Sequence, residues 1–340
     1  MRALKNLVSA VILLSSALFL SACDSVEERA EQHYQSALVL ISEKDIDRAV
    51  VELRNAVTLD ATHKAARQTL AELLLEKGNR QGAYRQYLRL AETFPDDLDS
   101  RIILSEMAFS SGSWDEFDRH SSRAEELAPD NPRVKAIALV RSYRVAINDN
   151  DAGTRRSLAS KASDMLGDQP ENVLLRNTLI DNALREQDYT QALAQIDWMI
   201  DFDPTKLSHY QERLRVLSTI GDETAVEAQL REMMKIFPDD PSNRETLIRY
   251  YVSRNNLDAA EGVLRDLVVA SGSEDPGPTL DLIRFLAEFR DPEDVRAEIS
   301  KALSERADPV PFQIIEARFE FSLGNHDEAI ATLQDVLSKA

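Results

Sequence analysis

The stretch KAARQTLAELLLEKGNRQGAYRQYLRLAETFPDD, residues 64–97, contains two apolar stripes with helical spacing, and each stripe is followed by a residue that ends a helix. The first stripe has the i, i+1, i+4 spacing of a buried helix face, and the second has the i, i+4, i+7 spacing. The stripes consist of Leu70, Ala71 and Leu74, and of Ala83, Tyr87 and Leu90. Gly78 follows the first stripe as a left-handed C-cap residue, and Pro95 prevents the second helix from continuing. The stretch therefore predicts two helices, each followed by a turn.

Glycines and prolines recur along the chain at a spacing of 34 residues. The groups with this spacing are Gly78 and Gly112, Pro95 and Pro129, and Pro170, Pro204 and Pro238. Pro129 and Pro170 are 41 residues apart, so seven extra residues lie between them, and we expect NDNDAG (148–153) to lengthen the turn between two helices there. A fixed period of this length indicates an array of structural repeats.

The 34-residue pattern resembles the tetratricopeptide repeat, a helix-turn-helix unit with small, aromatic and proline residues at fixed positions. In residues 98–131, for example, Gly112, Phe117 and Pro129 occupy such positions. The resemblance covers nearly all of residues 30–340 and implies an all-α fold, a right-handed superhelical solenoid of about nine repeats with a concave inner face. Regular units are expected at 30–63, 64–97, 98–131, 173–206, 207–240, 241–274 and 310–340, and degenerate units near 132–172 and 275–309.

The N-terminus has the parts of a bacterial secretory signal peptide in the usual order. Arg2 and Lys5 give a cationic start, and residues 7–20 are apolar apart from three serines. A helix that crosses a membrane needs about 20 apolar residues, so this run is too short for one. Small residues then lead to the cysteine at position 23, as at the end of a signal peptide. We therefore expect residues 1–22 to be removed from the mature protein.

Cys23 is the only cysteine of the chain. The sequence LSAC (20–23) resembles the bacterial lipobox, which implies that the thiol of Cys23 carries a diacylglycerol and that residues 23–29 form a lipidated linker. The alternative is an uncleaved membrane anchor with an incidental cysteine. Asp24 resembles the signal that retains enterobacterial lipoproteins in the inner membrane. We therefore expect a lipid-anchored protein on the periplasmic face of the cell envelope, with the inner membrane favoured over the outer membrane.

Composition and motifs argue against nucleic-acid binding and against catalysis. The formal net charge of −19 repels phosphate backbones, so nucleic acid is not an expected partner. The sequence contains no phosphate-binding glycine loop, no dinucleotide fingerprint, no zinc-protease motif and no nucleophile-elbow motif. The histidines lie in different repeats and without metal-ligand spacing; they are His33, His63, His120, His209 and His326. We expect no enzyme activity, no cofactor and no metal site.

The resemblance implies that the first helix of each repeat lines the groove, with the ninth repeat position facing into it. In order along the chain, the residues at that position are Leu38, Glu72, Glu106, Asp181, Arg215, Arg249 and Arg318. One hypothesis is that the three arginines bind an anionic ligand, because guanidinium groups pair bidentately with carboxylates. The alternative is that they form solvated ion pairs of small energy, Arg215 with Asp181 and Arg249 with Glu245.

Two further surfaces are candidates for binding a partner. By the same register Tyr34 and Phe109 face the groove, where a partner helix or extended peptide could bury apolar side chains. Ile330 and Leu337 lie on the last helix, and we expect them to be exposed, because no polar closing helix follows them in this sequence. A partner or a second copy could dock there, or the natural protein could continue beyond residue 340.

These features lead to one main functional hypothesis and two alternatives. The main hypothesis is a membrane-anchored, periplasm-facing scaffold that binds other proteins through the groove and supports assembly of an envelope complex. The first alternative is an accessory lipoprotein of an exopolysaccharide or exosortase-type export system, because residues 49–57 and 65–78 look like that group. The second alternative is an outer-membrane protein assembly lipoprotein, a group from which Asp24 and the larger number of repeats depart.

Overall fold

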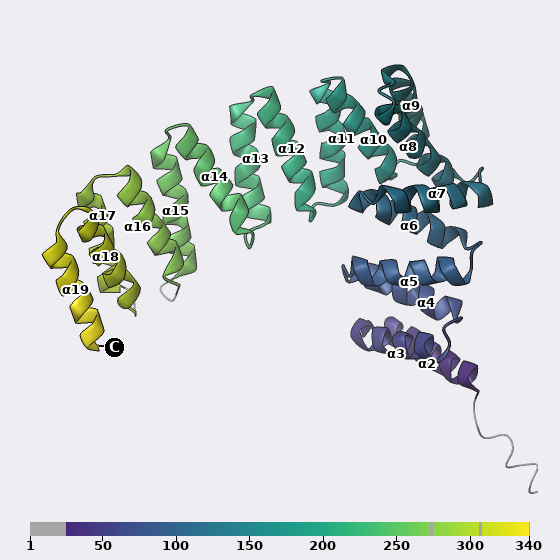
Figure 1. Cartoon of the computed structure of the whole chain (residues 1–340), viewed down its shortest axis with the longest axis horizontal. Helices are drawn as coiled ribbons and strands as arrows, with labels where there is room; N and C mark the ends of the chain where they lie inside the picture. The colour runs from purple at the N-terminus through teal and green to yellow at the C-terminus, as the bar shows by residue number, and fades with distance from the viewer. Residues whose placement is uncertain (1–24, 273–274, 306–307, 340) are drawn as a thin grey trace, which may run out of the picture. The chain divides into compact units, whose positions relative to one another are not determined.

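The computed structural model describes residues 25–272, 275–305 and 308–339, and these residues form eighteen helices and no strand (Figure 1). This confirms the predicted all-α class. The helices follow one another in nine pairs, each with a first and a second helix. The pairs are α2 (Val26–Ser42) and α3 (Ile46–Leu59); α4 (Lys64–Glu76) and α5 (Arg80–Thr93); α6 (Leu98–Ser111) and α7 (Trp114–Leu127); α8 (Pro132–Asn148) and α9 (Ala152–Met165); α10 (Val173–Arg185) and α11 (Tyr189–Phe202); α12 (Leu207–Ile220) and α13 (Glu223–Ile236); α14 (Pro241–Ser253) and α15 (Leu257–Ser271); α16 (Gly277–Phe289) and α17 (Pro292–Glu305); and α18 (Val310–Ser322) and α19 (His326–Lys339).

The first pair begins earlier in the chain than the repeat pattern indicates. Helix α2 starts at Val26, so residues 26–29, which were expected to be linker, form its first turn. The cause is a capping box: the Ser25 hydroxyl accepts from the backbone N–H of Glu28 (3.1 Å), and the Glu28 carboxylate accepts from the backbone N–H of Ser25 (2.8 Å). The other residues of the N-terminal prediction, 1–22, Cys23 and Asp24, lie outside the described residues.

The seven extra residues near position 150 lengthen a helix and a connection, and not the turn between two helices. Helix α8 has 17 residues where α4 has 13. The turn between α8 and α9 spans residues 149–151, which matches the length of the turn at residues 77–79. The remaining extra residues lie in the connection 166–172 after α9. The prediction that NDNDAG lengthens the turn is therefore wrong, because Asn148 ends α8 and Asp151 caps α9.

The turn inside a pair requires a residue with positive φ in most repeats. Gly78 has φ +73°, as predicted for a left-handed C-cap. The equivalent residues with positive φ are Lys44, Gly112, Asn150, Gln187, Gly221, Asn255 and Gly324. Because four of these are not glycine, the spacing of glycines alone shows only part of the repeat. The residue after this turn position caps the second helix through its side chain at Asp45, Asn79, Asp151, Asp188, Asp222 and Asn256.

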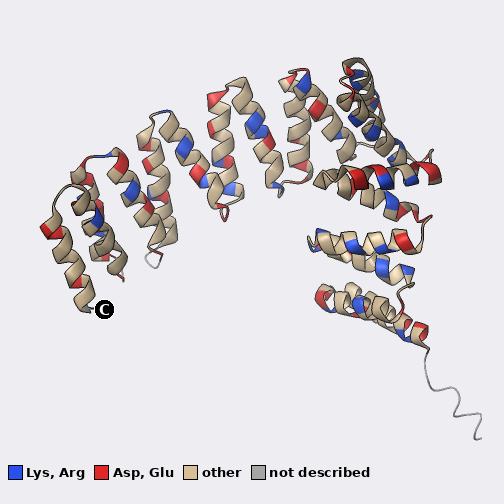
Figure 2. Cartoon of the chain, viewed as in Figure 1, with Lys and Arg blue, Asp and Glu red and all other residues tan. Residues whose placement is uncertain are grey.

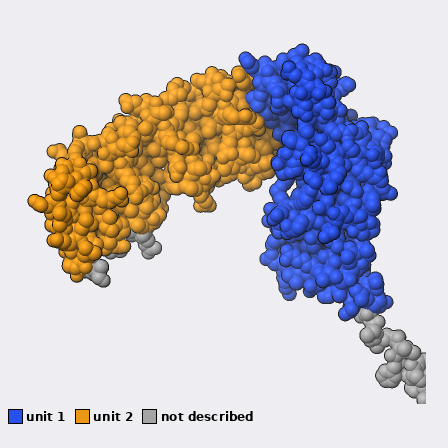
Figure 3. Space-filling view, in the orientation of Figure 1, with its two compact units in different colours: residues 1–187 blue, residues 188–340 orange. Residues whose placement is uncertain are grey.

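The chain divides into two compact units, one ending at Gln187 and the other beginning at Asp188 (Figure 3). The sequence predicted one array over residues 30–340, whereas the division falls inside the fifth pair, between α10 and α11. In the first unit α10 packs on α8 and α9, and in the second unit α11 packs on α12. The core of the second unit runs through α12 to α18, and the first unit holds three smaller apolar clusters.

The fourth residue of several first helices hydrogen bonds to the connection before that helix. In each case the side chain donates to the carbonyl oxygen of the residue six positions earlier. The pairs are Arg67 to Ala61 (2.9 Å), Arg101 to Pro95 (3.5 Å), Arg176 to Pro170 (2.6 Å) and Tyr210 to Pro204 (3.1 Å). This hydrogen bond gives a partner to a carbonyl oxygen that lies outside the helices. It also fixes the connection between successive repeats. In three of the four repeats this residue is an arginine, and the tetratricopeptide pattern expects an aromatic residue there.

His120 on α7 is fully buried beside one of these arginines. Its Nδ1 lies 3.2 Å from Nη1 of Arg101 and therefore accepts a hydrogen bond, and its Nε2 lies 3.3 Å from the Glu116 carboxylate. Burial, reinforced by the positive charges of Arg119 and Arg101, lowers the pKa of His120 to about 4. The folded protein therefore keeps this imidazole neutral at pH values where the unfolded chain protonates it.

The first prediction concerns the pH dependence of the first unit. Between about pH 6.5 and pH 4 the unfolded chain binds a proton that folded His120 does not, so the free energy of unfolding falls as the pH falls. The loss attributable to this residue is about 3 kcal/mol. In His120→Gln, the amide oxygen can accept from Arg101 as Gln86 accepts from Arg67 (2.9 Å). We therefore expect this variant to lose less stability on acidification than the wild type.

Urea unfolding followed by the fluorescence of Trp114, in a chain with Trp198→Phe, measures this in the first unit alone, because the chain has only these two tryptophans. His209→Gln serves as the control. His209 is also buried with a lowered pKa, but it lies in the second unit. Equal losses for wild type and His120→Gln between pH 7 and about pH 4.5 would show that His120 does not carry the effect.

Candidate functional site

Clefts in both units are lined mainly by first helices. In the first unit, a cleft of about 570 Å³ lies between α6, α8 and the start of α10, and a pocket of about 290 Å³ adjoins it. Phe109 lines both of them. In the second unit, a cleft of about 480 Å³ lies between α16 and α18, and Arg318 is part of its wall. These volumes are in the range of protein ligand sites. We call them the α6–α10 cleft, the Phe109 pocket and the α16–α18 cleft.

The Phe109 pocket has an aromatic wall. The ring of Phe109 meets Trp114 edge to face, with centroids 5.8 Å apart, and lies 6.0 Å from the ring of Phe117. Trp114 is 40% exposed, and the guanidinium of Arg144 lies 4.2 Å from the centroid of its ring. A cation held over an aromatic face fixes the orientation of both groups. The pocket therefore presents an apolar surface beside the guanidinium groups of Arg144 and Arg185, which form ion pairs with Asp118 (3.1 Å) and Asp181 (2.7 Å).

Asp181 lies in the same pocket as Phe109, but its carboxylate already has partners. Tyr143 donates to it from its hydroxyl (2.8 Å), and Arg185 donates from Nε (2.7 Å). Burial and the neighbouring carboxylate of Asp181 raise the pKa of Tyr143, so the hydroxyl keeps its proton. Glu106 is paired in a similar way with Arg133 of the next first helix, at 2.8 Å. The acidic half of the predicted row is therefore largely neutralised within the first unit.

The arginines of the second unit have weaker internal partners. Arg215 pairs with Glu212 one turn earlier on α12 (3.0 Å), and Arg249 donates to the hydroxyl of Thr246 at 3.4 Å. Arg318 forms no ion pair with any residue that the structure describes. These partners differ from the pairs that the alternative hypothesis expected, Arg215 with Asp181 and Arg249 with Glu245. The side chains of Arg215, Arg249 and Arg318 are all exposed.

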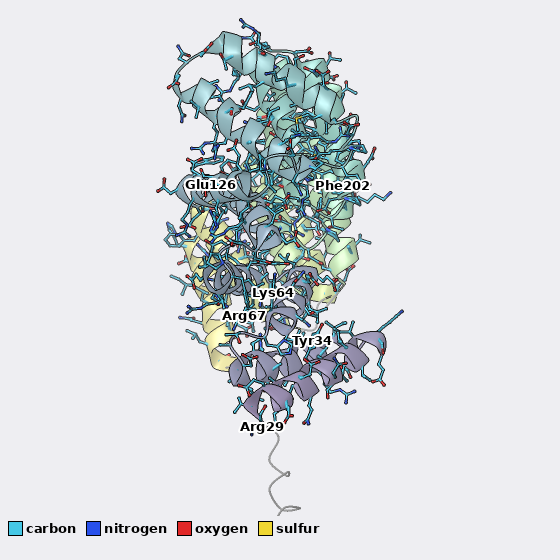
Figure 4. All side chains as sticks on the ribbon, turned by 90° about the vertical axis from the view of Figure 1, so that its right-hand side faces the viewer. Arg29, Tyr34, Lys64, Arg67, Glu126 and Phe202 are labelled. Carbon is cyan, nitrogen blue, oxygen red and sulfur yellow. The ribbon has the colours of Figure 1, made fainter. Side chains whose placement is uncertain are left out.

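Tyr34 is a packing residue between the first two repeats. Its ring lies 5.0 Å from that of His63 and contacts the apolar core of the first unit. His63 precedes α4, accepts from the backbone N–H of Ala66 at Nδ1 (3.1 Å) and contacts Glu31 of α2 through Nε2 (3.0 Å). Tyr34 points toward the start of α4, where Lys64 is located (Figure 4). Tyr34 is half-buried, so only part of its side chain is available to a ligand.

The last helix presents apolar side chains to solvent. Ile330 and Leu337 are 51% and 77% exposed, and Phe321 at the end of α18 is 59% exposed. The expected exposure is therefore present, and docking at this face stays a prediction.

No helix among the described residues is both long and apolar enough to cross a membrane. Across the same residues, no cluster of three or more His, Cys, Asp or Glu side chains could hold a metal ion.

Arg284 was not among the groove residues predicted from the sequence, because the unit near 275–309 was treated as degenerate. Arg284 follows Arg249 by 35 residues and precedes Arg318 by 34, so it falls in the same row. It is exposed on α16 and lines the α16–α18 cleft together with Arg318. The signal was present in the arginine spacing, although the apolar pattern of this unit fits the repeat poorly. Trp114 and Arg144 were also missed, because they lie outside the groove positions of the repeat.

Comparison with known proteins agrees with the repeat pattern. A family model described as tetratricopeptide repeat matches residues 40–102, which run from the end of α2 to the start of α6. This segment is therefore similar to tetratricopeptide repeats in sequence. Because the same helix pair recurs through the described residues, the match supports a tetratricopeptide-repeat protein. No curated protein matches the chain.

Solved structures with tetratricopeptide repeats are similar to the chain at low identity. A tetratricopeptide repeat protein from Parabacteroides merdae is 11% identical, with a TM-score of 0.46 over 76% of this chain and 98% of that chain. PilF of Pseudomonas aeruginosa is 14% identical, with a TM-score of 0.41 over 65% and 97%. PilW, described as a type IV pilus biogenesis factor, is 13% identical, with a TM-score of 0.44 over 64% and 98%. At these scores the likeness carries no argument about function.

Proposed function

We propose that the protein is a lipid-anchored scaffold on the periplasmic face of the bacterial envelope, and that it binds a partner protein along its first helices. The observation that carries the proposal is the position of the clefts. In each unit they open between neighbouring first helices and combine apolar walls with charged side chains at the rim. Surfaces of this kind bind extended or helical segments of other proteins. Binding along several repeats would bring partners together for assembly of an envelope complex.

The anchor is part of the same proposal. The lipobox-like LSAC before residue 24 supports attachment of lipid at Cys23. Each buried methylene of a lipid chain contributes about 0.8 kcal/mol, and stable anchoring needs more than one chain. Asp24 supports the inner membrane as the location. The repeats begin two residues later, at Val26, so the first unit would stand close to the membrane surface and its clefts would be available to partners in the periplasm.

The proposal is tested by crosslinking in intact cells. Photoreactive residues placed on first helices should yield products with a partner protein, and those placed at exposed positions of second helices should not. Products of equal yield from both sets would show that the first helices do not form the binding surface. An absence of crosslinked protein at every position would contradict the proposed scaffold function itself.

A further inference from the structure

The second unit carries a continuous row of four arginines on successive first helices. They are Arg215 on α12, Arg249 on α14, Arg284 on α16 and Arg318 on α18. Successive members are separated by 34, 35 and 34 residues, and all four are exposed. Each follows a residue that packs inward, for example Ile283 before Arg284 and Ala317 before Arg318. Because the helices share this register, the four guanidinium groups lie on the same face of their repeats.

The row is less neutralised than the surface around it. Arg215 and Arg284 pair only with the carboxylates of Glu212 and Asp281 one turn earlier on their own helices, and such exposed pairs contribute about 0–1 kcal/mol. Arg249 has the neutral Thr246 at the equivalent place, and Arg318 has the apolar Ile315. A chain with a formal charge of −19 therefore keeps a row of accessible cations on these first helices, which Figure 2 shows to carry basic residues.

An apolar cleft opens between the last two members of the row. Arg284 and Arg318 line the α16–α18 cleft, and its remaining wall includes Ile283, Ile315 and Phe319. Helices α16 and α18 contact one another, so the two arginines project from directly neighbouring helices. The volume of about 480 Å³ is sufficient for apolar side chains of a bound segment. The site thus combines a hydrophobic cavity with positive charges on both of the helices that form it.

We propose that the arginine row and the α16–α18 cleft together bind an extended acidic segment of a partner protein that also carries an apolar residue. This inference rests on the proposed scaffold function and adds the chemistry of the partner. Helices α16 and α18 are in contact, and packed helices lie 8–10 Å apart, which is about three residues of an extended chain. The segment therefore has two acidic residues about three positions apart that meet Arg284 and Arg318, an apolar side chain between these two, and further acidic residues toward Arg249 and Arg215.

The apolar cleft distinguishes a peptide from an acidic polysaccharide. Both could pair their carboxylates with the arginine row. The walls formed by Ile283, Ile315 and Phe319 favour a ligand that buries hydrocarbon, since burial of apolar surface contributes about 25 cal/mol per Å². A polyuronate offers hydroxyl groups at that place, and their desolvation opposes binding. The structure therefore favours the acidic peptide.

Fluorescence anisotropy with a defined probe tests this inference. The probe is a labelled synthetic peptide of about twelve residues, with glutamate at every third position and leucine between the last two glutamates. The full chain is purified from membranes in mild detergent. We expect the double variant Arg284→Glu/Arg318→Glu to bind the probe at least about tenfold more weakly than the wild type. Binding by the wild type should weaken when salt is raised from about 0.05 M to 0.5 M.

Arg48→Glu/Arg89→Glu is the matched control. Both residues are exposed arginines that pair with a carboxylate three residues away, as Arg284 does, but they lie on second helices of the first unit. This control has the same net charge as the test variant and should keep wild-type affinity. A second peptide with glutamine in place of glutamate should bind weakly to the wild type.

Three results would contradict the inference: no binding of the acidic probe to the wild type, equal affinity for the glutamine peptide, or equal loss in the control and test variants. Binding of a polyuronate but not of the peptide would assign the row to a polysaccharide instead. If the probe fails while partner crosslinks from first helices persist in cells, the scaffold function stands and only the acidic chemistry of the ligand is wrong.

Discussion

Cys23→Ser is expected to move the protein from the membrane pellet to the soluble fraction after cell breakage. Acylation at a lipobox requires a thiol, and the serine hydroxyl does not replace it. Without the lipid, the apolar segment that remains, residues 7–20, is too short to span a bilayer. The formal charge of −19 also gives the chain no attraction for an anionic membrane surface. The measurement is fractionation of cells that express wild type or variant, with detection of an epitope tag.

Asp24→Asn is the matched control for this experiment. It changes the residue next to the cysteine and leaves the thiol in place, so the protein should stay in the membrane pellet. If Asp24 is the retention signal, this variant should appear in the outer-membrane fraction, and the wild type should appear in the inner-membrane fraction. Retention of Cys23→Ser in the pellet after an alkaline carbonate wash would contradict lipid anchoring and would favour an uncleaved anchor.

Phe117→Ala is expected to produce a large loss of stability in the first unit. The ring is 0% exposed and packs against Phe109 and Trp114, so its removal leaves a cavity in addition to the lost transfer energy. The expected decrease in the free energy of unfolding is about 3–5 kcal/mol. Because stability in a repeat array is largely local, the loss should appear in the first unit and not in the second.

Urea unfolding reported by Trp114, in a Trp198→Phe background, measures this loss. Phe109→Ala is the control, because it removes the same ring from a half-buried position at the pocket wall. The decrease in the free energy of unfolding should be smaller for Phe109→Ala than for Phe117→Ala. A larger loss for Phe109→Ala than for Phe117→Ala would contradict the assignment of Phe117 to the core and of Phe109 to the binding surface.

The sequence locates most first helices of the regular repeats because the signals for them are local. Most first helices start at the residue that begins the predicted unit, for example Lys64 and Leu98. In these units the apolar stripe, the turn residue and the proline after the second helix agree with one another. Helix α2 starts before the predicted unit, because the capping box at Ser25 and Glu28 lies outside the 34-residue pattern.

Polar side-chain contacts could not be predicted from the repeat pattern. The pattern describes apolar positions, whereas the bond from Arg101 to the carbonyl of Pro95 and the pairing of Asp181 with Arg185 and Tyr143 depend on side chains between those positions. The repeat register therefore identified exposed arginines on successive first helices, but it did not identify the partners of their side chains. The sequence also does not mark the division of the chain near residue 187, because the fifth pair has a regular repeat sequence.

The measurement that tests the account most directly is a crosslinking scan in intact cells. A photoreactive amino acid is placed at Phe109 and Arg249 on first helices, and at the exposed Arg85 and Glu232 on second helices. We expect Phe109 and Arg249 to yield crosslinked partner protein, and Arg85 and Glu232 to yield none. Crosslinks confined to the second helices, or spread evenly over all four positions, would contradict the claim that this chain works by binding proteins along its first helices.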